Sequence, residues 1–256
     1  MMGSDGRVAR GGSLRGETNA MASPQRNAAI DDARRLLANC MLFRGLVENE
    51  RDAVVARARL RHFAAGETIF LMGSPGDSMM AVLGGQVRIS VPSPEGREIV
   101  LAIFQPGEVF GEIALLDGKE RTADARAMTA CDLAILERRD VFAFLERKPD
   151  AWPRLVEVLC DRLRTTDQHI AEVALLQLPV RLAKALLRMA DSEANTAKGS
   201  ATVQMSQREL GNIVGAARES VNKCLRDWQR SGLVRIEGTS ITISNRATLE
   251  DVAEQS

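Results

Sequence analysis

The segment from Phe110 to Ala123 reads Phe-Gly-Glu-Ile-Ala-Leu-Leu-Asp-Gly-Lys-Glu-Arg-Thr-Ala. Gly111 has no Cβ atom, so its backbone can approach a ligand closely, and the run Glu-Ile-Ala-Leu-Leu after it favours a short helix. A helix start presents unpaired N–H groups and the positive end of the dipole, which suit a phosphate. Arg121 adds a cation after the Asp-Gly turn, so the stretch predicts an anion site.

Glu112 gives this site a second property. A carboxylate beside a phosphate is repelled unless it binds another group, and sugar hydroxyls are natural donors to it. Phosphate and ribose together indicate a nucleotide. The structural alternative is that Arg121 and Glu112 pair with each other on a surface loop.

The same pattern resembles the phosphate-binding cassette of the cyclic nucleotide-binding domain. The resemblance implies that Arg121 contacts the cyclic phosphate, Glu112 the ribose 2′-hydroxyl, and Thr122 the phosphate or the base. The expected ligand site also includes the start of the short helix, namely Gly111, Ile113 and Ala114.

Composition limits the classes of protein to which the chain can belong. The chain has 256 residues, 45% of them hydrophobic, enough for two modest domains and a tail. Lys and Arg balance Asp and Glu at 34 each, so a DNA-binding face must be a local patch. No apolar run approaches the roughly 18 residues of a membrane span, and the N-terminus lacks a hydrophobic signal region. We expect a soluble, cytoplasmic protein without a membrane partner.

The four cysteines, Cys40, Cys131, Cys160 and Cys224, are scattered without a CxxC pair. This spacing indicates neither a zinc site nor a disulfide framework, and we expect free thiols and no metal. The motifs also offer no nucleophile, base and orienting group that could act together, so an enzyme is not expected.

The N-terminal half divides into a tail, a helical lead and a glycine-rich module. Residues 1–27 lack periodic apolar residues and predict a disordered tail, in which Met21 could be the true start. Helical patterns over 31–40 and 48–57 follow. Short β-type runs punctuated by glycines from residue 60 to 136 predict an antiparallel roll, with a strand over 87–91 and a turn at Pro94–Gly96. The glycine spacing also resembles the cyclic nucleotide-binding domain, which we place at residues 28–150.

A helix over 138–147 precedes a long one over 151–178, in which apolar residues recur at alternating three- and four-residue steps. This coiled-coil seam predicts a parallel homodimer; the alternative is one amphipathic helix packed on its own domain. Its members are Val156, Leu159, Leu163, Thr166, Ile170 and Val173.

Thr166 is the polar member of this seam. Its hydroxyl bonds either a backbone carbonyl or a ligand at the dimer interface. This helix resembles that of catabolite activator proteins, which supplies a Thr-Ser pair whose threonine contacts the purine amine. The resemblance implies that contact for Thr166, in the matching pair Thr166-Asp167. We expect Asp167 either to accept hydrogen bonds from a purine amine or, as we favour, to point to water.

Pro179 predicts a helix break near Leu178 and a second domain over 179–248. Ser206 and Glu209 form a predicted capping box for a helix that Gly215 ends. A second helix over 217–229 and a hairpin wing over 234–243 complete a winged helix-turn-helix. A plain helical hairpin with a solvated face is the alternative.

Arg218 and Glu219 lie at the exposed start of the second helix, where an arginine can read guanine and a glutamate can accept from cytosine. Residues 209–223 resemble the recognition segment of the Crp/Fnr regulators, which reads a TGTGA-type half-site. Lys223 replaces an arginine there, and Ala217 replaces a frequent serine. The expected DNA contacts are Ser206, Gln207, Arg218, Glu219, Ser220, Asn222 and Lys223.

The expected fold is therefore α+β: a cyclic nucleotide-binding antiparallel β-roll, a dimerisation helix and a winged helix-turn-helix. The resemblance implies a homodimeric transcription regulator that binds cyclic AMP, double-stranded DNA and RNA polymerase. Alternatives are cyclic GMP or another effector, an effector-independent regulator, a haem or iron–sulfur sensor, and a nucleotide domain serving a kinase or channel.

Overall fold

The computed structural model describes residue 43 and residues 46–93, 98–193 and 202–255. Three expectations fall outside these residues: the tail with its start at Met21, the helix over 31–40 and the turn at Pro94–Gly96. None of the described helices is long and apolar enough to cross a membrane.

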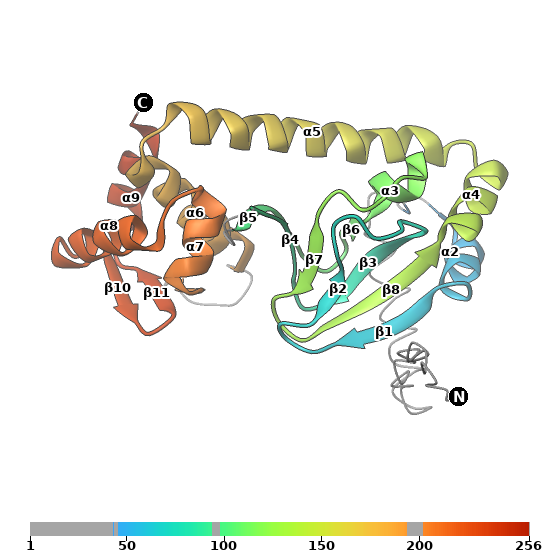
Figure 1. The fold of residues 1–256 in the computed structure, drawn as a ribbon, viewed down its shortest axis with the longest axis horizontal. Helices are drawn as coiled ribbons and strands as arrows, with labels where there is room; N and C mark the ends of the chain where they lie inside the picture. The colour runs from blue at the N-terminus through green and yellow to red at the C-terminus, as the bar shows by residue number, and fades with distance from the viewer. Residues whose placement is uncertain (1–42, 44–45, 94–97, 194–201, 256) are drawn as a thin grey trace, which may run out of the picture.

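The N-terminal module is an antiparallel roll made of two four-stranded sheets (Figure 1). The first has the order β1 (Arg59–Phe63), β8 (Cys131–Glu137), β3 (Ser78–Gly84), β6 (Val109–Phe110). The second has the order β2 (Thr68–Phe70), β7 (Asp124–Ala127), β4 (Val87–Pro92), β5 (Glu98–Phe104). The expected antiparallel roll is confirmed.

Apolar side chains from both sheets form one core in this roll. Phe110 is fully buried, with its ring centroid 5.6 Å from that of Phe104 and 5.9 Å from that of Phe70. Apolar Val87, Ile89 and Val91 alternate with polar residues along β4, which predicts Ser90 on the polar face, yet Ser90 is only 2% exposed. The β4–β5 register shifts between Ile89 and Ser90, whose partners are Ala102 and Val100, so the extra residue of this bulge is Leu101 of β5.

Two helices cover the end of the roll that is formed by β3 and β8. They are α2 (Glu48–Val55) and α4 (Arg138–Arg147), and both share a core cluster with Phe43 and Leu155. The helix expected over 138–147 is confirmed. This cluster fixes the start of the next helix against the roll, because Leu155 is itself part of it.

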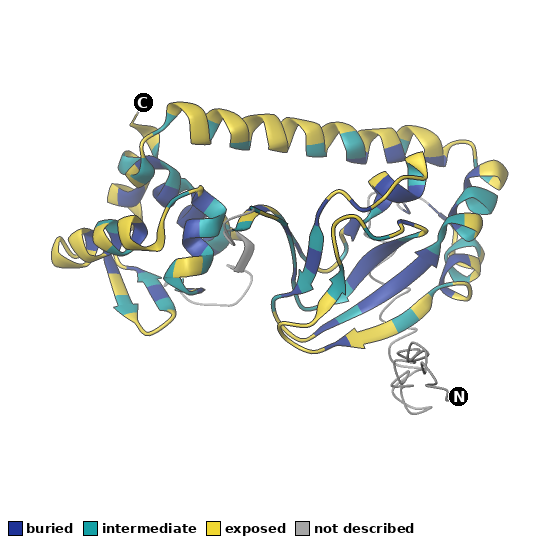
Figure 2. Ribbon diagram, viewed as in Figure 1, coloured by how far each residue is buried: buried dark blue, intermediate teal, exposed yellow. Residues whose placement is uncertain are grey.

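The long helix α5 (Ala151–Leu175) runs from the roll to the C-terminal domain and is followed by α6 (Leu178–Glu193) (Figure 1). The break falls at Leu176 and Gln177, before the predicted position, and Pro179 lies in the first turn of α6, where its missing N–H is tolerated. Figure 2 shows that most of the outer surface of α5 is exposed.

The C-terminal domain is a winged helix-turn-helix. The helices α7 (Gln207–Val214) and α8 (Arg218–Arg230) precede the hairpin of β10 (Val234–Glu237) and β11 (Ser240–Ile243). The capping box predicted at Ser206 and the left-handed Gly215 after α7 are both confirmed. Two elements were not predicted, the third wing strand β9 (Thr202–Gln204) and α9 (Arg246–Glu254).

Two glycines of the roll provide a test of its packing. Gly85 and Gly107 have φ angles of 76° and 92°. A Cβ atom on Gly85 would lie 2.7 Å from Cys131 Cβ and closer still to the Ala130 carbonyl oxygen, whereas the space around Gly107 is open. We expect Gly107→Ala to lower the free energy of unfolding by about 1 kcal/mol. Gly85→Ala should cost about 2 kcal/mol more, because the backbone must also shift.

Urea unfolding of both variants measures this difference. Trp152 packs on Phe142 beside the roll, with ring centroids 6.2 Å apart, so its fluorescence in a Trp228→Phe background reports on this part of the molecule. Equal losses in the two variants would contradict the packing described around Gly85.

Candidate functional site

The predicted anion site is built around α3 (Glu112–Asp117), which follows β6 directly. Gly111 is the N-cap residue with a φ of 81°, a left-handed conformation that favours glycine, and a Cβ atom there would lie 2.6 Å from Arg121 Nη1. Ala114 is buried in the roll, whereas Ile113 is 46% exposed. The helix predicted to start after the glycine is confirmed.

Arg121 is buried in the roll, with only 4% of its surface exposed. Its Nη1 donates to the Gly111 carbonyl oxygen at 2.7 Å, its Nη2 donates to Ser78 Oγ at 3.0 Å, and the guanidinium lies 4.3 Å from the centroid of Phe70. Among the described residues, its buried Nε atom has no hydrogen-bond partner. The guanidinium is therefore held rigidly and still has an unused donor.

Burial lowers the pKa of the Arg121 guanidinium from its usual value, while the nearby charges of Asp77 and Glu112 act in the opposite direction. Arginine nevertheless keeps its charge in proteins. A buried cation without a directly bonded carboxylate favours the approach of an anion, because an anion would compensate the desolvation.

Glu112 is fully buried, and its partner is not the one considered from the sequence. Its Oε1 forms an ion pair with Nη1 of Arg162, which projects from α5. Nη2 of Arg162 also donates to the Val109 carbonyl oxygen, and the guanidinium lies 4.7 Å from the centroid of Phe104. The surface pair between Arg121 and Glu112 is thus not what the structure shows.

Sequence reasoning missed Ser78, Phe70 and Arg162. Arg162 did carry a signal, because it continues the spacing of Leu155 and Val158, the residues of α5 that are buried against the roll. An arginine on the buried side of an amphipathic helix requires a carboxylate or carbonyl partner on the surface that the helix covers. Ser78 and Phe70 lie on other strands, and nothing local in the sequence connects them to Arg121.

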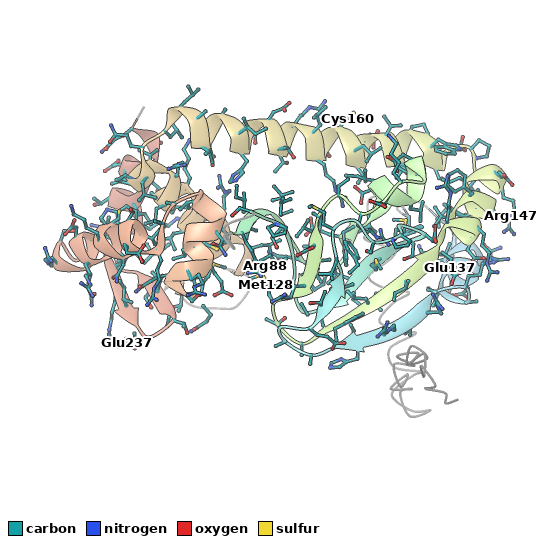
Figure 3. All side chains as sticks on the ribbon, in the orientation of Figure 1. Arg88, Met128, Glu137, Arg147, Cys160 and Glu237 are labelled. Carbon is teal, nitrogen blue, oxygen red and sulfur yellow. The ribbon has the colours of Figure 1, made fainter. Side chains whose placement is uncertain are left out.

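The structure brings Gly111, Glu112 and Arg121 together and, besides Ile113, leaves three expected ligand residues exposed. These are Thr122, at the start of the segment before β7, and Thr166 and Asp167 on α5. Figure 3 shows Cys160 on the side of α5 that is turned away from the roll. Asp167 lies two helical turns further on and therefore on the same side.

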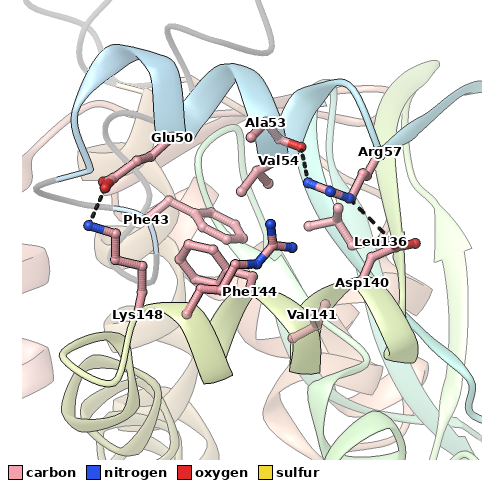
Figure 4. Close-up of a pocket in the computed structure, with 11 residues that line it drawn as sticks. Phe43, Glu50, Ala53, Val54, Arg57, Leu136, Asp140, Val141, Phe144 and Lys148 are labelled. Carbon is pink, nitrogen blue, oxygen red and sulfur yellow. Dashed lines mark hydrogen bonds and ion pairs between the residues drawn. The ribbon is translucent and has the colours of Figure 1, made fainter.

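A separate small cavity lies between α2 and α4 (Figure 4) and has a volume of about 120 Å³. Its wall is largely apolar, with Phe43 and Phe144 in edge contact at 5.9 Å. Two cations at its rim pair with carboxylates, Lys148 with Glu50 and Arg57 with Asp140, and a third, Arg147, donates to the Ala143 carbonyl oxygen at 2.8 Å. We interpret this cavity as a packing defect in the helical layer.

The second candidate surface is the start of α8. Arg218, Glu219, Ser220 and Lys223 are exposed and Asn222 is half-buried, while Val221 and Leu225 point into the domain core. Ser206 Oγ accepts from the Glu209 backbone N–H at 3.3 Å and donates to Glu209 Oε2 at 2.6 Å, and Gln207 is half-buried beside it. The start of α8 thus exposes polar side chains to solvent, while the apolar side chains of the same helix pack in the domain core.

Comparison with known families identifies both domains. Residues 60–148 match the family described as cyclic nucleotide-binding domain, and residues 180–252 match the Crp-like helix-turn-helix domain. The fold and these matches define a transcription regulator with a cyclic nucleotide-binding domain and a DNA-binding domain. The chain belongs to the Crp/Fnr family, as the following relatives show.

The chain is 33% identical over 217 residues to a CRP-like cAMP-activated global transcriptional regulator of Mycobacterium tuberculosis, covering 84% of this chain and 96% of that protein. A Crp/Fnr-family regulator structure from Thermus thermophilus is 30% identical, with a TM-score of 0.68 over 77% of this chain and 99% of that one. The c-di-GMP-responsive regulator CLP of Xanthomonas campestris is 25% identical, with a TM-score of 0.70 over 78% of this chain and 100% of that one.

The ion pair between Arg162 and Glu112 can be tested by removing each partner. Arg162→Met should lower the free energy of unfolding by about 1–3 kcal/mol, because it leaves a carboxylate buried without its cation. Adding Glu112→Gln should restore most of that loss. Arg164→Gln, which breaks only the exposed pair with Asp161, serves as the control and should change stability by less than about 0.5 kcal/mol. Additive losses in the double variant, measured by urea unfolding, would rule out the pair.

Proposed function

We propose that this Crp/Fnr regulator is a homodimer whose affinity for DNA is controlled by cyclic AMP. The observation that carries the proposal is the buried guanidinium of Arg121, which keeps one unpaired N–H group beside the equally buried carboxylate of Glu112. A cyclic phosphodiester and a ribose hydroxyl are complementary to these two groups.

The proposed ligand contacts follow from this geometry. Arg121 binds the cyclic phosphate together with the backbone of Gly111, Ile113 and Ala114 at the start of α3. Glu112 accepts a hydrogen bond from the ribose hydroxyl, and Thr122 contacts the phosphate or the base. Thr166 and Asp167 are exposed on α5 and are available to a purine at the interface between two subunits. No metal takes part in this site.

Cyclic AMP is preferred as the effector because a relative that matches most of this chain is named as cAMP-activated. Cyclic GMP is an alternative, since Thr122 and Asp167 offer polar contacts to a guanine. The Xanthomonas regulator is named for its response to c-di-GMP, so other cyclic nucleotides belong in the same comparison. An effector-independent regulator would keep the roll but show no response to any of them.

The homodimer is supported by the seam of α5. Val156, Leu163 and Ile170 are 52%, 62% and 60% exposed in the single chain, whereas Leu155 and Val158 of the same helix are buried against the roll. A helix with one apolar face on its own domain and a second apolar face in solvent requires a partner, and a second copy in parallel orientation completes it. The seam is thus not explained by packing on the chain's own domain.

In such a dimer, each subunit would contribute one DNA-reading surface. Two α8 helices related by a two-fold axis fit a palindromic TGTGA-type site with half-sites one DNA turn apart. Arg218 reads guanine and Glu219 accepts from cytosine, while Ser206, Gln207, Ser220, Asn222 and Lys223 contact the phosphates or neighbouring bases. RNA polymerase is a further proposed partner and the cytoplasm the proposed location.

Other sensor chemistries are less well supported. Burial raises the pKa of the Cys131 thiol to about 11 and that of Cys224 to about 11, which disfavours the reactive thiolate form at both. In the part of the chain that the structure describes, no group of three or more His, Cys, Asp or Glu side chains could hold a metal ion. The Crp-like helix-turn-helix domain favours a role on DNA over a role in a kinase or channel.

The effector and Arg121 can be tested together in one mobility-shift assay on a palindromic TGTGA-type duplex. We expect cyclic AMP to raise the affinity of the unaltered chain for DNA. Arg121→Ala should weaken nucleotide binding about 10- to 150-fold, since a hydrogen bond to a charged group contributes about 1.5–3 kcal/mol. Calorimetry with cyclic AMP, cyclic GMP and c-di-GMP identifies the preferred effector.

Arg61→Ala is the matched control for this variant. Arg61 also lies over a phenylalanine of the roll, 4.7 Å from the centroid of Phe63, but on the exposed strand β1. Its nucleotide affinity should remain unchanged. Intact nucleotide affinity in the Arg121→Ala variant would refute the assigned phosphate contact. If none of the nucleotides changed the affinity of the unaltered chain for DNA, effector control would be refuted.

The recognition helix makes a separate prediction. Arg218→Ala should weaken binding to the palindrome by about 1–3 kcal/mol and relax the preference for guanine at one position of each half-site. Arg230→Ala is the control, because Arg230 lies at the other end of α8 and pairs with Asp227 at 3.2 Å. Competition with duplexes altered at single base pairs measures both effects. An equal loss on all sequences would make Arg218 a phosphate contact instead.

A further inference from the structure

The heptad positions of α5 assign a place to each charged residue beside the seam. With Val156, Leu163 and Ile170 at a and Leu159, Thr166 and Val173 at d, the g positions are Leu155, Arg162 and His169, and the e positions are Cys160, Asp167 and Ala174. The g residues are buried or half-buried against the chain's own roll and C-terminal domain. The e residues are all exposed.

Arg162 contacts the chain's own roll and is also partly exposed to solvent. Through Nη1 and Nη2 it holds Glu112 and the Val109 carbonyl oxygen of its own roll, yet its side chain remains 26% exposed. It is adjacent in sequence to Leu163, a seam residue that is 62% exposed. A guanidinium has five N–H donors in a planar fork, so these two contacts leave donors free on the exposed side.

Asp167 is the complementary charge on the same helix. It is exposed, and no hydrogen bond or ion pair to another described residue is found for its carboxylate. In a parallel dimer, a residue at g lies beside the residue at the following e position of the other helix. The e position that follows Arg162 is 167.

We infer that Asp167 of the partner subunit pairs with Arg162, so that each candidate ligand site is completed by a carboxylate from the other chain. The inference rests on the homodimer of the proposed function. Asp167 then acts as a positioning residue through Arg162, and it need not touch the nucleotide. It also explains why an acidic residue stands beside an otherwise apolar seam.

The pair links the two subunits to the buried Glu112. The partner's Asp167 fixes Arg162, Arg162 fixes the Glu112 carboxylate, and Glu112 is the proposed acceptor for the ribose hydroxyl. Each ligand site is thereby connected to the dimer interface by two consecutive ion pairs. Linkage then requires that a nucleotide which rearranges Glu112 also changes the dimer dissociation constant.

The experiment is a double-mutant cycle on the dimer dissociation constant, measured by energy transfer between labelled full-length protomers. Asp167→Asn should raise this constant about three- to thirtyfold, because two symmetry-related pairs are lost and each partly exposed pair is worth a few tenths to about 1 kcal/mol. In a Glu112→Gln, Arg162→Met background the same substitution should change it less than twofold. Asp167→Glu keeps the charge and should keep the constant within twofold of the unaltered chain.

Asp161→Asn is the matched control, because Asp161 is also an exposed aspartate of α5 but pairs with Arg164 of its own chain at 3.0 Å. It should leave the dissociation constant unchanged. An equal effect of Asp167→Asn in both backgrounds, or no effect in either, would overturn the inferred pair while the dimer stands. A monomeric unaltered chain in sedimentation would overturn the dimer and the pair together.

Discussion

The burial of two opposite charges in one layer of the roll is the constraint on which the arrangement depends. Taking Arg121 and Glu112 out of water is costly, and each is retained only because other groups of the chain compensate it. Arg121 is compensated by a carbonyl and a hydroxyl of the roll, whereas Glu112 is compensated by a cation from α5. The first charge fixes the ligand site within the roll, and the second ties that site to the helix that leaves it.

Much of this fold follows from local sequence rules. Gly111, Gly215 and Ser206 each impose a backbone conformation or a cap, and the boundaries predicted from them are those observed. The apolar steps of α5 predict the helix and its seam, although the break after it falls before the predicted position. Gly85 shows why the glycine pattern indicates a roll, since its neighbours leave no room for a side chain.

The parts that could not be predicted depend on contacts between distant segments. The pairing of Glu112 with Arg162 spans fifty residues of sequence and is set by how α5 packs across the roll. The bulge at Ser90 depends on the register with β5, and β9 is too short to give a periodic signal until β11 pairs with it. Sequence reasoning therefore located the residues that carry charge but could not assign all of their partners.

Under the proposed function, a change at Glu112 would reach the DNA-binding helices through the connection between α5 and the C-terminal domain. Among the described residues, contacts of limited size connect that domain to α5 and the roll. Arg188 of α6 pairs with Glu172 of α5 at 2.8 and 3.2 Å, Arg181 donates to the Val173 carbonyl oxygen at 3.4 Å, and Ile103 and Met128 of the roll pack against the core of the domain. The two residues between α5 and α6 are non-helical, so the chain can turn there without breaking helical hydrogen bonds.

A shift of α5 at Arg162 would also move Glu172 and Val173, because they belong to the same helix. These two residues contact Arg188 and Arg181 of α6, so the shift would reach the helix on the other side of the break. A ligand that binds the two arrangements with equal affinity would leave their populations unchanged, however tightly it bound. Control of DNA binding by a ligand therefore requires a protein group whose binding partner differs between the two arrangements. Under the proposed function Glu112 would satisfy this condition, because the ribose hydroxyl would bond to a carboxylate that Arg162 of α5 holds in this structure.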